Sequence, residues 1–284
     1  MAAQKLLGKP VATEIRERVK TYVAEERRQR GTVPGLAVVL VGEDAPSQIY
    51  VGLKHQAAVA AGMRSIERRL PEQSRTEDVR AVVEALNQDP EVNGILVQFP
   101  LPPHIDRQQI LDHIDAKKDV DGLTRLSQGS VSQNIPGLRP CTAVGIMDIL
   151  AHYHIPVAGR RAVVIGRSAL VGLPAALMLM QKQATVTIVH SRTLGSADIA
   201  RQADILVAAA GRPGLVDGTW IKPGAVVVDV GIHRTDHGIV GDVVSQHAEE
   251  LASAVTPVPG GIGPMTIAEL MQNTWLAYCD QVGR

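Results

Sequence analysis

A tyrosine and a lysine one helical turn apart are the first residues whose types and spacing could do chemistry. Tyr50 and Lys54 lie four residues apart in VGEDAPSQIYVGLKHQ, after a plausible N-cap at Ser47, so a helix would place both on one face. The ring could stack on a flat substrate while the amine moves a proton, if burial lowers the lysine pKa toward neutrality. A half-buried tyrosine beside a lysine whose stem covers apolar surface has the same spacing, so both interpretations stay open.

Three further segments carry polar groups that could complete such a site. Gln98 ends an apolar strand and precedes the rigid turn Phe99-Pro100-Leu101-Pro102-Pro103, so its amide is well placed to hold a ligand or a water. Asp119 and Asp121 bring two carboxylates to an expected domain junction. The Gly- and Pro-rich segment Thr256–Thr266 presents backbone amides ahead of a helix expected to start near Thr266.

A second kind of chemistry is indicated by the segment RAVVIGRSALVGLPAALML, which has the order strand, tight turn, helix. Gly166 ends the apolar run, Ser168 can cap the helix, and Gly172 lets the helix lie close to the sheet. Backbone amides at such a helix start attract phosphate. The spacing differs from the usual G-x-G-x-x-G, so a plain structural turn is an equally good interpretation of this segment alone.

The next strand favours NADP over NAD. Thr185–Val189 ends in His190-Ser191-Arg192-Thr193, where a Rossmann domain meets the adenine ribose, and an acidic residue there would select NAD. Here Ser191 and Arg192, with Arg167 in the preceding turn, suit a 2′-phosphate. The alternative is that both arginines are solvated surface residues.

Two further strands end in loops at the same expected sheet edge. Ile205–Gly211 runs into Arg212-Pro213-Gly214, and Ala225–Val230 runs into Gly231-Ile232-His233. Open α/β sheets bind ligands at this edge. Asp229 lies within the second strand and is either a functional carboxylate or one whose hydrogen bonds come from loop amides; we favour the loop amides.

These residues must be positioned by alternating strands and helices, which predict a two-domain α/β protein with parallel sheets. The expected strands are Leu36–Val41, Gly94–Gln98, Ala162–Ile165, Thr185–Val189, Ile205–Ala208 and Ala225–Val230. The expected helices are Val11–Gln29, Ser47–Ala61, Thr76–Leu86, Thr142–Tyr153, Leu170–Met180 and Ile267–Val282. We expect an N-terminal α/β substrate domain over residues 1–121, completed by the C-terminal helix at 265–284. A Rossmann-like, doubly wound parallel sheet should occupy residues 122–264, after the weakly periodic segment Asp119–Pro140.

The composition excludes several classes of protein. Lys plus Arg and Asp plus Glu both number 29, which argues against a nucleic-acid partner. Two cysteines exclude a disulfide framework and fit no metal site, and no apolar run approaches the ~18 residues of a membrane span. With only seven aromatic residues, the core must be aliphatic, which suits a buried parallel sheet. We expect a soluble intracellular protein without nucleic-acid or membrane partners.

Taken together and in order, the motifs resemble the methylenetetrahydrofolate dehydrogenase/methenyltetrahydrofolate cyclohydrolase family over nearly the whole chain. In the first half they are Tyr50-Val51-x-x-Lys54, Val97-Gln98-x-Pro100-Leu101-Pro102 and Asp119-Val120-Asp121-Gly122. In the second half they are Arg139-Pro140-Cys141-Thr142, Gly166-Arg167-Ser168-x-x-Val171-Gly172-x-Pro174, His190-Ser191-x-Thr193, Asp229-Val230-Gly231-Ile232 and Pro257–Thr266.

The resemblance implies two reactions at one site: NADP-dependent oxidation of 5,10-methylenetetrahydrofolate to the methenyl cation, then hydrolysis to 10-formyltetrahydrofolate. It assigns proton transfer to Lys54, ordering of the reacting groups to Gln98, stacking on the folate to Tyr50, and a hydrogen bond to the pterin amino edge to Asp121. The implied folate contacts also include Val97, Pro100, Gly260, Gly261 and Ile262. The implied NADP contacts are Gly166, Arg167, Ser168, Ser191 and Ile232, beside the Arg192 suggested above. The family further implies a cytoplasmic homodimer with a place in purine biosynthesis.

The chain departs from the family pattern around the folate site. After Asp-Gly the family usually reads Phe-His-Pro-x-Asn-x-Gly, whereas Leu123–Gly129 here reads LTRLSQG. Gln56 stands where a second basic residue is common, and Ala143 where proline is common. Two alternatives therefore stay open: a dehydrogenase with weakened cyclohydrolase, and a catalytically quiet folate- or NADP-binding paralogue. Without the family match, a shikimate-dehydrogenase-like oxidoreductase would be the interpretation.

Overall fold

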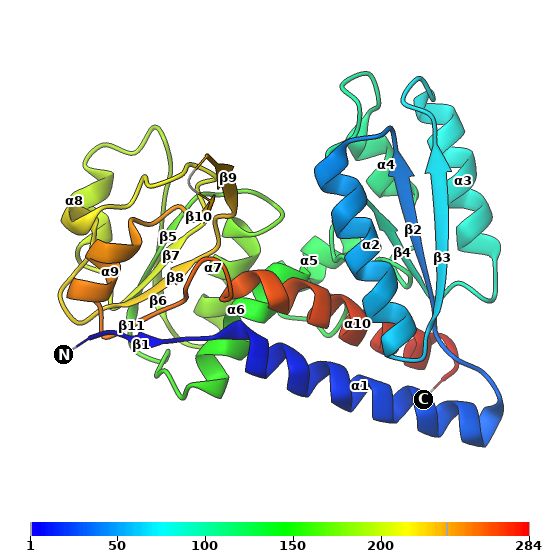
Figure 1. Ribbon diagram of the computed structural model, residues 1–284, viewed down its shortest axis with the longest axis horizontal. Helices are drawn as coiled ribbons and strands as arrows, with labels where there is room; N and C mark the ends of the chain where they lie inside the picture. The colour runs from blue at the N-terminus through cyan, green and yellow to red at the C-terminus, as the bar shows by residue number, and fades with distance from the viewer. Residues whose placement is uncertain (1, 237, 284) are drawn as a thin grey trace. The chain divides into compact units, whose positions relative to one another are not determined.

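The computed structural model describes residues 2–236 and 238–283 and divides into two compact units (Figure 1). The three-strand unit comprises Thr13–Cys141 and Ile267–Arg284, and the six-strand unit comprises Met1–Ala12 and Thr142–Thr266. Each unit is built on its own parallel sheet, as the alternation of strands and helices predicts.

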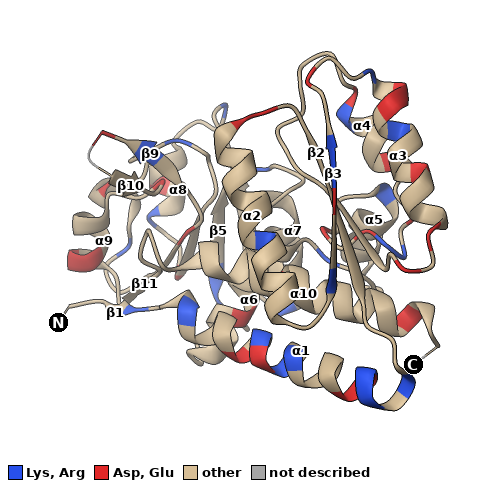
Figure 2. Ribbon diagram, turned by 45° about the vertical axis from the view of Figure 1, so that its right-hand side comes forward, with Lys and Arg blue, Asp and Glu red and all other residues tan. Residues whose placement is uncertain are grey.

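The sheet of the three-strand unit has β2 (Gly35–Val41) at its centre. The strands β3 (Arg64–Leu70) and β4 (Gly94–Val97) flank it, both parallel to it. Every residue of β2 and β4 is buried, because Val, Leu and Ile fit a strand that is covered on both faces. The helices α2 (Ala45–Ala60) and α3 (Thr76–Gln88) lie on opposite sides of the sheet (Figures 1 and 2).

Four further helices belong wholly or mostly to this unit. They are α1 (Gly8–Arg30), α4 (Arg107–His113), α5 (Arg125–Gln133) and α10 (Ile262–Gln281). Acidic and basic residues both occur along α1 (Figure 2), and its last turn carries Arg27, Arg28 and Arg30. Three of the seven aromatic residues form one stack, in which Trp275 lies 5.6 Å from Tyr22 and 5.8 Å from Tyr278 between ring centroids.

The start of α2 corrects one expectation. The N-cap is Asp44 rather than Ser47: its carboxylate accepts hydrogen bonds from the Ser47 amide at 2.9 Å and from the Ser47 hydroxyl at 2.6 Å. A carboxylate cap that bonds the third residue of the helix stabilises this end, because a negative charge interacts favourably with the positive N-terminal end of the helix dipole.

The six-strand unit has one parallel sheet with the order β1-β11-β8-β7-β5-β6, and a separate antiparallel hairpin, β9–β10. The strands are β1 (Gln4–Lys5), β5 (Arg161–Ile165), β6 (Thr185–Val189), β7 (Ile205–Ala208), β8 (Val226–Asp229), β9 (His233–Thr235), β10 (Gly238–Val240) and β11 (Ala254–Val255). The helical elements are α6 (Cys141–His152), α7 (Gly172–Gln181), α8 (Ser196–Ala200), the 3₁₀ turn η1 (Gly218–Trp220) and α9 (Ser245–Leu251).

The strand order creates a switch point beside β5. The chain passes from β5 through α7 to β6 on one side, and then continues to β7 on the other side of β5. Ligands of doubly wound sheets bind where the order reverses, outside the carboxyl ends of the strands. The core of this sheet is aliphatic, with Leu206 and Val227 fully buried, as the shortage of aromatic residues predicts.

The compact units divide the chain about 20 residues later than the expected domains, which met at 121 and 122. The segment that follows Asp121 bonds back to the three-strand unit: Asp119 accepts from the amides of Leu123 and Thr124, and the Cys141 thiol donates to Val120 O. The start of the chain differs too, because β1 pairs with β11 in the other unit. The C-terminal residues from Ile267 belong to the three-strand unit.

Within residues 2–236 and 238–283, none of the helices combines the length and the apolar character that a membrane crossing requires.

Candidate active site

The centre of the three-strand unit's polar cluster is the Lys54 amine. Lys54 lies on α2, and its Nζ donates a 2.8 Å hydrogen bond to Gln98 Oε1 at the end of β4. Gln98 in turn donates from Nε2 to the Phe99 carbonyl at 2.7 Å, which fixes the direction of the amide. Burial lowers the Lys54 pKa from its ordinary value, while the nearby Asp121 carboxylate opposes that shift. The structure thus provides what the spacing of Tyr50 and Lys54 only allowed, an amine whose proton is easier to remove.

Asp121 is the ionic neighbour of this amine. Burial raises the Asp121 pKa, the Lys54 ammonium and Arg107 lower it, and the charge of Asp119 raises it. The pKa values of the two groups therefore move toward each other.

Cys141 lies in the same cluster, although the sequence pattern gave it no role beyond its motif. Its thiol donates to the Val120 carbonyl at 3.3 Å, and burial raises its pKa well above the ordinary value, so the group stays a neutral thiol. Its place in Arg139-Pro140-Cys141-Thr142 was the available signal. That motif's distance of some twenty residues from Asp121 concealed the contact.

Asn273 fixes the backbone that carries Asp121. From α10 its amide nitrogen donates to the carbonyls of Val120 at 2.9 Å and Arg139 at 2.8 Å. Between these two contacts, Gly122 has φ +70°, and a Cβ there would lie 2.4 Å from the Arg139 carbonyl carbon. The turn therefore requires glycine, and its geometry fixes the backbone next to Asp121.

Asp119, the second carboxylate of the motif, does structural work. It is 1% exposed and accepts from the amides of Leu123 at 3.1 Å and Thr124 at 2.7 Å, at the start of α5.

The other expected folate contacts in this unit differ in what they can offer. Tyr50 is 40% exposed, so part of its side chain is accessible to a ligand, and Pro100 is exposed in the Pro-rich turn after β4. Val97 is 3% exposed within β4, so only its backbone remains for a ligand. Arg107 lies 4.2 Å above the Phe99 ring, a contact that the sequence did not predict.

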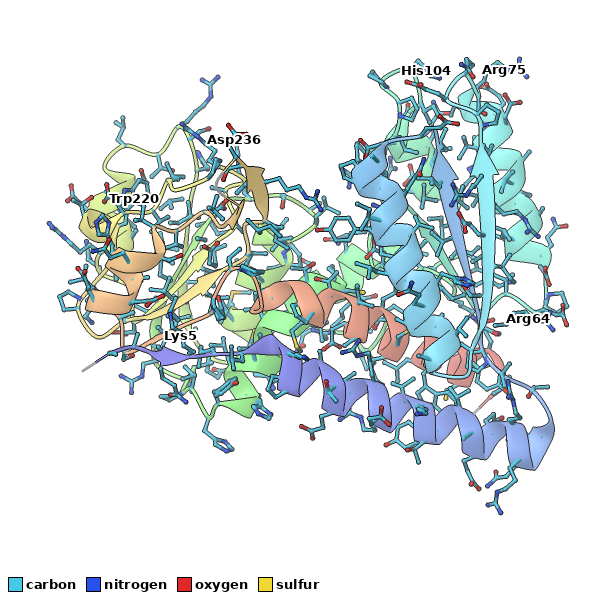
Figure 3. The ribbon with its side chains drawn as sticks, in the orientation of Figure 1. Lys5, Arg64, Arg75, His104, Trp220 and Asp236 are labelled. Carbon is cyan, nitrogen blue, oxygen red and sulfur yellow. The ribbon has the colours of Figure 1, made fainter. Side chains whose placement is uncertain are left out.

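A pocket of about 390 Å³ opens at the switch point of the six-strand unit. Its lining comes from the ends of β5, β6 and β7 and from the loops that follow them, and comprises Ile165, Gly166, Arg167, Val189, His190, Ser191, Ser196, Ala210, Arg212, Leu215 and Trp220. Trp220, labelled in Figure 3, comes from η1. Parallel-sheet proteins bind nucleotides at this place.

Two glycines shape the floor of this pocket. Gly166 has φ +113°, and a Cβ on it would lie 2.1 Å from Ala209 O. A Cβ on Gly172 would lie 2.4 Å from Gly166 O, so α7 begins directly against the turn. The N-cap of α7 is Val171 rather than the expected Ser168, although Ser168 Oγ accepts from the amides of Val171 at 3.2 Å and Gly172 at 3.4 Å and so bonds the turn that leads into the helix.

The cations of the pocket are Arg167 and Arg212. Arg167 was expected, but among the residues that the structure describes, Arg192 does not line the pocket, and Arg212 from the loop after β7 does. The Arg192 amide instead donates to His190 Nδ1 at 3.2 Å, within the turn after β6. Two guanidiniums and the Ser191 hydroxyl around a glycine turn fit a dinucleotide with a 2′-phosphate.

The remaining expected residues lie elsewhere in this unit. Ile232 is 46% exposed, after β8. Gly260 O accepts from the Gly8 amide at 2.9 Å, Gly261 N donates to Pro257 O at 2.7 Å, and the buried Ile262 begins α10, four residues earlier than expected. Close packing explains the glycine at 261, because a Cβ there would lie 2.7 Å from Pro257 O.

Asp229 has the structural role that we favoured. Its carboxylate accepts from the amides of Gly231 at 2.9 Å, Asp242 at 2.9 Å and Val243 at 3.0 Å. Burial nevertheless raises its pKa to about 6, against the lowering effect of these amides.

Both halves of the chain match models of one protein family. Residues 6–121 match the family model for the tetrahydrofolate dehydrogenase/cyclohydrolase catalytic domain, and residues 140–282 match the model for the NAD(P)-binding domain of the same family. The chain is 49% identical over 291 residues to the bifunctional protein FolD of Parvibaculum lavamentivorans, covering 100% of this chain and 98% of that protein.

Two solved structures extend the likeness to the fold. The bifunctional enzyme FolD of Campylobacter jejuni, a methylenetetrahydrofolate dehydrogenase/cyclohydrolase, superposes with a TM-score of 0.96 at 40% identity, over 99% of this chain and all of that one. The Trypanosoma brucei N5,N10-methylenetetrahydrofolate dehydrogenase-cyclohydrolase, complexed with NADP cofactor and inhibitor, gives a TM-score of 0.95 at 40% identity over both whole chains.

Proposed function

The chain belongs to the tetrahydrofolate dehydrogenase/cyclohydrolase family, and from this premise we propose that it catalyses two successive reactions on a folate. The first oxidises 5,10-methylenetetrahydrofolate to the 5,10-methenyl cation with NADP, and the second hydrolyses that cation to 10-formyltetrahydrofolate. The observation that carries the proposal is the half-buried Lys54 amine with its lowered pKa, hydrogen-bonded to Gln98.

When bound, NADP supplies the acceptor for the hydride that leaves the methylene bridge. The chain binds it at the turn that contains Gly166, where the closely packed Gly172 brings the start of α7 directly against that turn. Arg167, Arg212 and Ser191 offer charge and hydrogen bonds to the 2′-phosphate. Binding in a fixed orientation is the main contribution of this unit, because the hydride transfer needs close and aligned reactants.

The hydrolytic step needs two protons removed from oxygen and one delivered to nitrogen. Water adds to the methenyl carbon and loses one proton, which gives a neutral carbinolamine. The carbon–N5 bond then breaks as the hydroxyl loses its proton and N5 takes one up, so the formyl group stays on N10 and one proton is released overall. Lys54, with its lowered pKa, takes the proton from the attacking water and returns it to the leaving nitrogen. Gln98 holds the amine in place through its Oε1.

The substrate's rings are held by neighbours of this amine. Tyr50 stacks its exposed ring face on the folate, and Asp121 hydrogen-bonds the amino edge of the pterin. Asp121 suits this role because its carboxyl oxygens can accept hydrogen bonds from an amino group. Val97 and Pro100, at the end of β4 and in the turn after it, belong to the same unit as this amine.

The test follows both chromophores in one cuvette. Purified protein is mixed with NADP and 5,10-methylenetetrahydrofolate, and the NADPH and methenyl bands are recorded separately. NADPH that forms without accumulation of the methenyl species, after subtraction of spontaneous hydrolysis, supports both activities. Neither band rising, with NAD also tried, contradicts the proposal and leaves a binding protein.

A dehydrogenase with weakened cyclohydrolase is the second candidate, and the altered segment Leu123–Gln128 is the observation that favours it. In the same assay it predicts that both bands rise together. The retained pair Lys54 and Gln98 speaks for the bifunctional reading.

The family resemblance also supports a homodimer, a cytoplasmic location and a supply of formyl groups to purine biosynthesis. Light scattering on the eluting protein tests the first of these, and a mass of about one chain would refute it.

A further inference from the structure

A buried carboxylate outside the assigned sites organises one wall of the NADP pocket. Asp242 is 0% exposed and accepts four hydrogen bonds. Its Oδ2 takes the amides of Ala210 at 2.6 Å and Gly211 at 2.9 Å, and its Oδ1 takes the Arg212 amide at 3.0 Å and His233 Nε2 at 2.7 Å. Three successive amides therefore converge on one side chain.

The segment held in this way is part of the pocket. Residues 210–212 follow β7 at the switch point, and Ala210 and Arg212 both line the pocket beside Gly166. Three amides that point inward to one acceptor set the direction of this backbone, and therefore where the Arg212 side chain starts. Charge-assisted hydrogen bonds to backbone amides are short and directional, so the wall has one defined position.

Asp242 is itself held from behind by a second carboxylate. Asp229 accepts from the amides of Asp242 at 2.9 Å and Val243 at 3.0 Å. A Cβ on Gly241 would lie 1.8 Å from Asp229 Oδ2, so the backbone before Asp242 lies directly against that carboxylate. Asp242 thus joins the end of β8 to the loop after β7, and cannot withdraw without breaking both sets of bonds.

Stability of the fold alone does not require a buried carboxylate at position 242. Burying a carboxylate carries a large desolvation penalty, and stability alone is often served as well by apolar side chains of similar size. The arrangement is explained if an exact loop geometry is needed for a ligand, since preorganised loops lower the cost of ordering on binding.

We infer that Asp242 is a positioning residue for NADP: it fixes the wall formed by Ala210 and Arg212 through its three amide contacts, and His233 completes its hydrogen bonding. The inference goes beyond the proposed reactions and rests on them only in taking NADP as the occupant of this pocket. The inference does not involve Lys54 or the hydrolytic step, because hydrolysis of added methenyltetrahydrofolate uses no NADP.

The test compares Asp242→Asn with a matched control. The asparagine keeps the size but turns an NH₂ group toward amides that need an acceptor. We expect the KM for NADP to rise about 10-fold, the effect of losing one charge-assisted hydrogen bond. The dehydrogenase kcat at saturating NADP and the hydrolysis of methenyltetrahydrofolate should stay within about 2-fold of the parent rates, an effect of the size of a minor perturbation.

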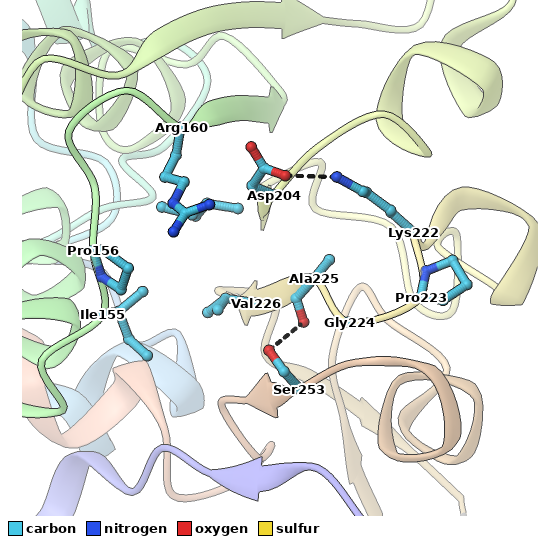
Figure 4. A pocket seen from close by; sticks show the side chains of 11 residues that line it. Ile155, Pro156, Arg160, Asp204, Lys222, Pro223, Gly224, Ala225, Val226 and Ser253 are labelled. Carbon is cyan, nitrogen blue, oxygen red and sulfur yellow. Dashed lines mark hydrogen bonds and ion pairs between the residues drawn. The ribbon is translucent and has the colours of Figure 1, made fainter.

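The control is Asp204→Asn, at the other end of β7. Asp204 pairs with Lys222 at 2.6 Å and accepts from the Arg161 amide at 2.9 Å, beside a different pocket of about 300 Å³ (Figure 4). Asp204→Asn makes the same chemical change in the same unit, and the KM for NADP should stay at the parent value. An unchanged KM in Asp242→Asn, or an equal rise in both variants, overturns the inference.

A second pair of variants decides the matter if Asp242→Asn does not fold. His233→Ala removes one donor to Asp242 and should raise the KM for NADP about 3-fold, the loss expected for one ordinary hydrogen bond. His233→Gln, whose amide can donate to the same oxygen, should restore it. A KM in His233→Ala equal to that of the parent protein, or a rise that glutamine leaves uncorrected, overturns the role of Asp242 as a positioning residue. Failure of the proposed function would instead appear as absent NADPH formation in the parent protein.

Discussion

Replacing Lys54 by methionine separates the two proposed activities. The methionine keeps the length and the apolar stem of the lysine on α2, and removes the amine that donates to Gln98 Oε1 at 2.8 Å. We expect Lys54→Met to lose methenyl hydrolysis while it still binds NADP, because the residues that line the NADP pocket belong to the six-strand unit.

The size of the loss follows from the role given to the amine. Positioned general acid–base groups contribute about 10²–10⁴-fold to a rate, so the hydrolytic kcat should fall at least about 100-fold. Stability should change little, by about 1 kcal/mol, because two effects oppose each other. The variant is spared the desolvation of a buried ammonium, while Gln98 Oε1 loses its donor. The pKa of Asp121, already raised by burial, should rise further in this variant because the Lys54 ammonium that lowers it is gone.

The pH profile gives the assay a signature that a packing defect lacks. Because burial lowers the Lys54 pKa, the parent rate of hydrolysis should rise with pH through that lowered value, and the variant should lack this limb. The unfolded chain keeps its proton up to about pH 10.4, so between the two pKa values the unfolded state binds more protons than the folded state. The free energy of unfolding contributed by Lys54 therefore increases with pH across that window, and the slope should vanish in Lys54→Met.

The measurement is the decay of added methenyltetrahydrofolate without NADP, from neutral pH upward, with spontaneous hydrolysis subtracted at each pH. NADP binding is measured on the same preparations to show that the variant is folded. Decay at the parent rate, or the same pH limb in both proteins, would refute the assignment of proton transfer to Lys54.

Three other substitutions are predicted from single contacts. Ser191→Asp places a carboxylate beside the expected 2′-phosphate and should raise the KM for NADP about 10- to 100-fold while that for NAD changes less; equal changes would contradict the NADP preference. Gly172→Ala forces a Cβ to within 2.4 Å of Gly166 O, so thermal unfolding should show a loss of about 1–3 kcal/mol together with weaker NADP binding, and a fully stable variant would show that α7 can move. Lys118→Met leaves the carbonyls of Leu86, Asn87 and Asp89 without the ammonium that donates to them at 2.6–3.1 Å. Denaturant titration should show that the free energy of unfolding falls by about 2–4 kcal/mol, while methenyl hydrolysis is retained. Loss of hydrolysis in the folded variant would extend the active site to this lysine.

All the strands predicted from the hydrophobic pattern form, although β6 is buried only at its last residue, Val189. Thr185–Val189 and Ile205–Ala208 have the expected bounds, because β-branched residues between turn residues favour the strand conformation. The strand β3 was not predicted, since RSIERRL carries four charges; it is stable as an edge strand that exposes part of its surface. The two-residue strands β1 and β11 exist only because distant segments pair, and no local pattern reports that.

The same division applies to the sites. Lys54, Gln98 and Asp121 were predicted because each stands in a local motif at the end of an element. Asn273 was not predicted, since its contacts with Val120 and Arg139 join segments about 130 to 150 residues apart. Arg212 lines the pocket in which Arg192 was expected. Which side chains line a pocket depends on how several loops come together, and the sequence of one turn does not show this.

The altered segment after Asp121 bears on which of the two enzymes this is. Its first residues give Asp119 two amide donors, and Thr124 begins α5 by accepting from the Ser127 amide at 3.2 Å. Gln128, one turn into that helix, donates to the Gly122 carbonyl at 2.8 Å, directly beside Asp121. The departures from the family pattern thus preserve a hydrogen-bonded support for the turn that carries this carboxylate. Because this support is made by the side chains of Asp119, Thr124 and Gln128 with backbone groups, it does not need the usual His, Pro and Asn. The bifunctional enzyme is therefore favoured over one with a weakened cyclohydrolase.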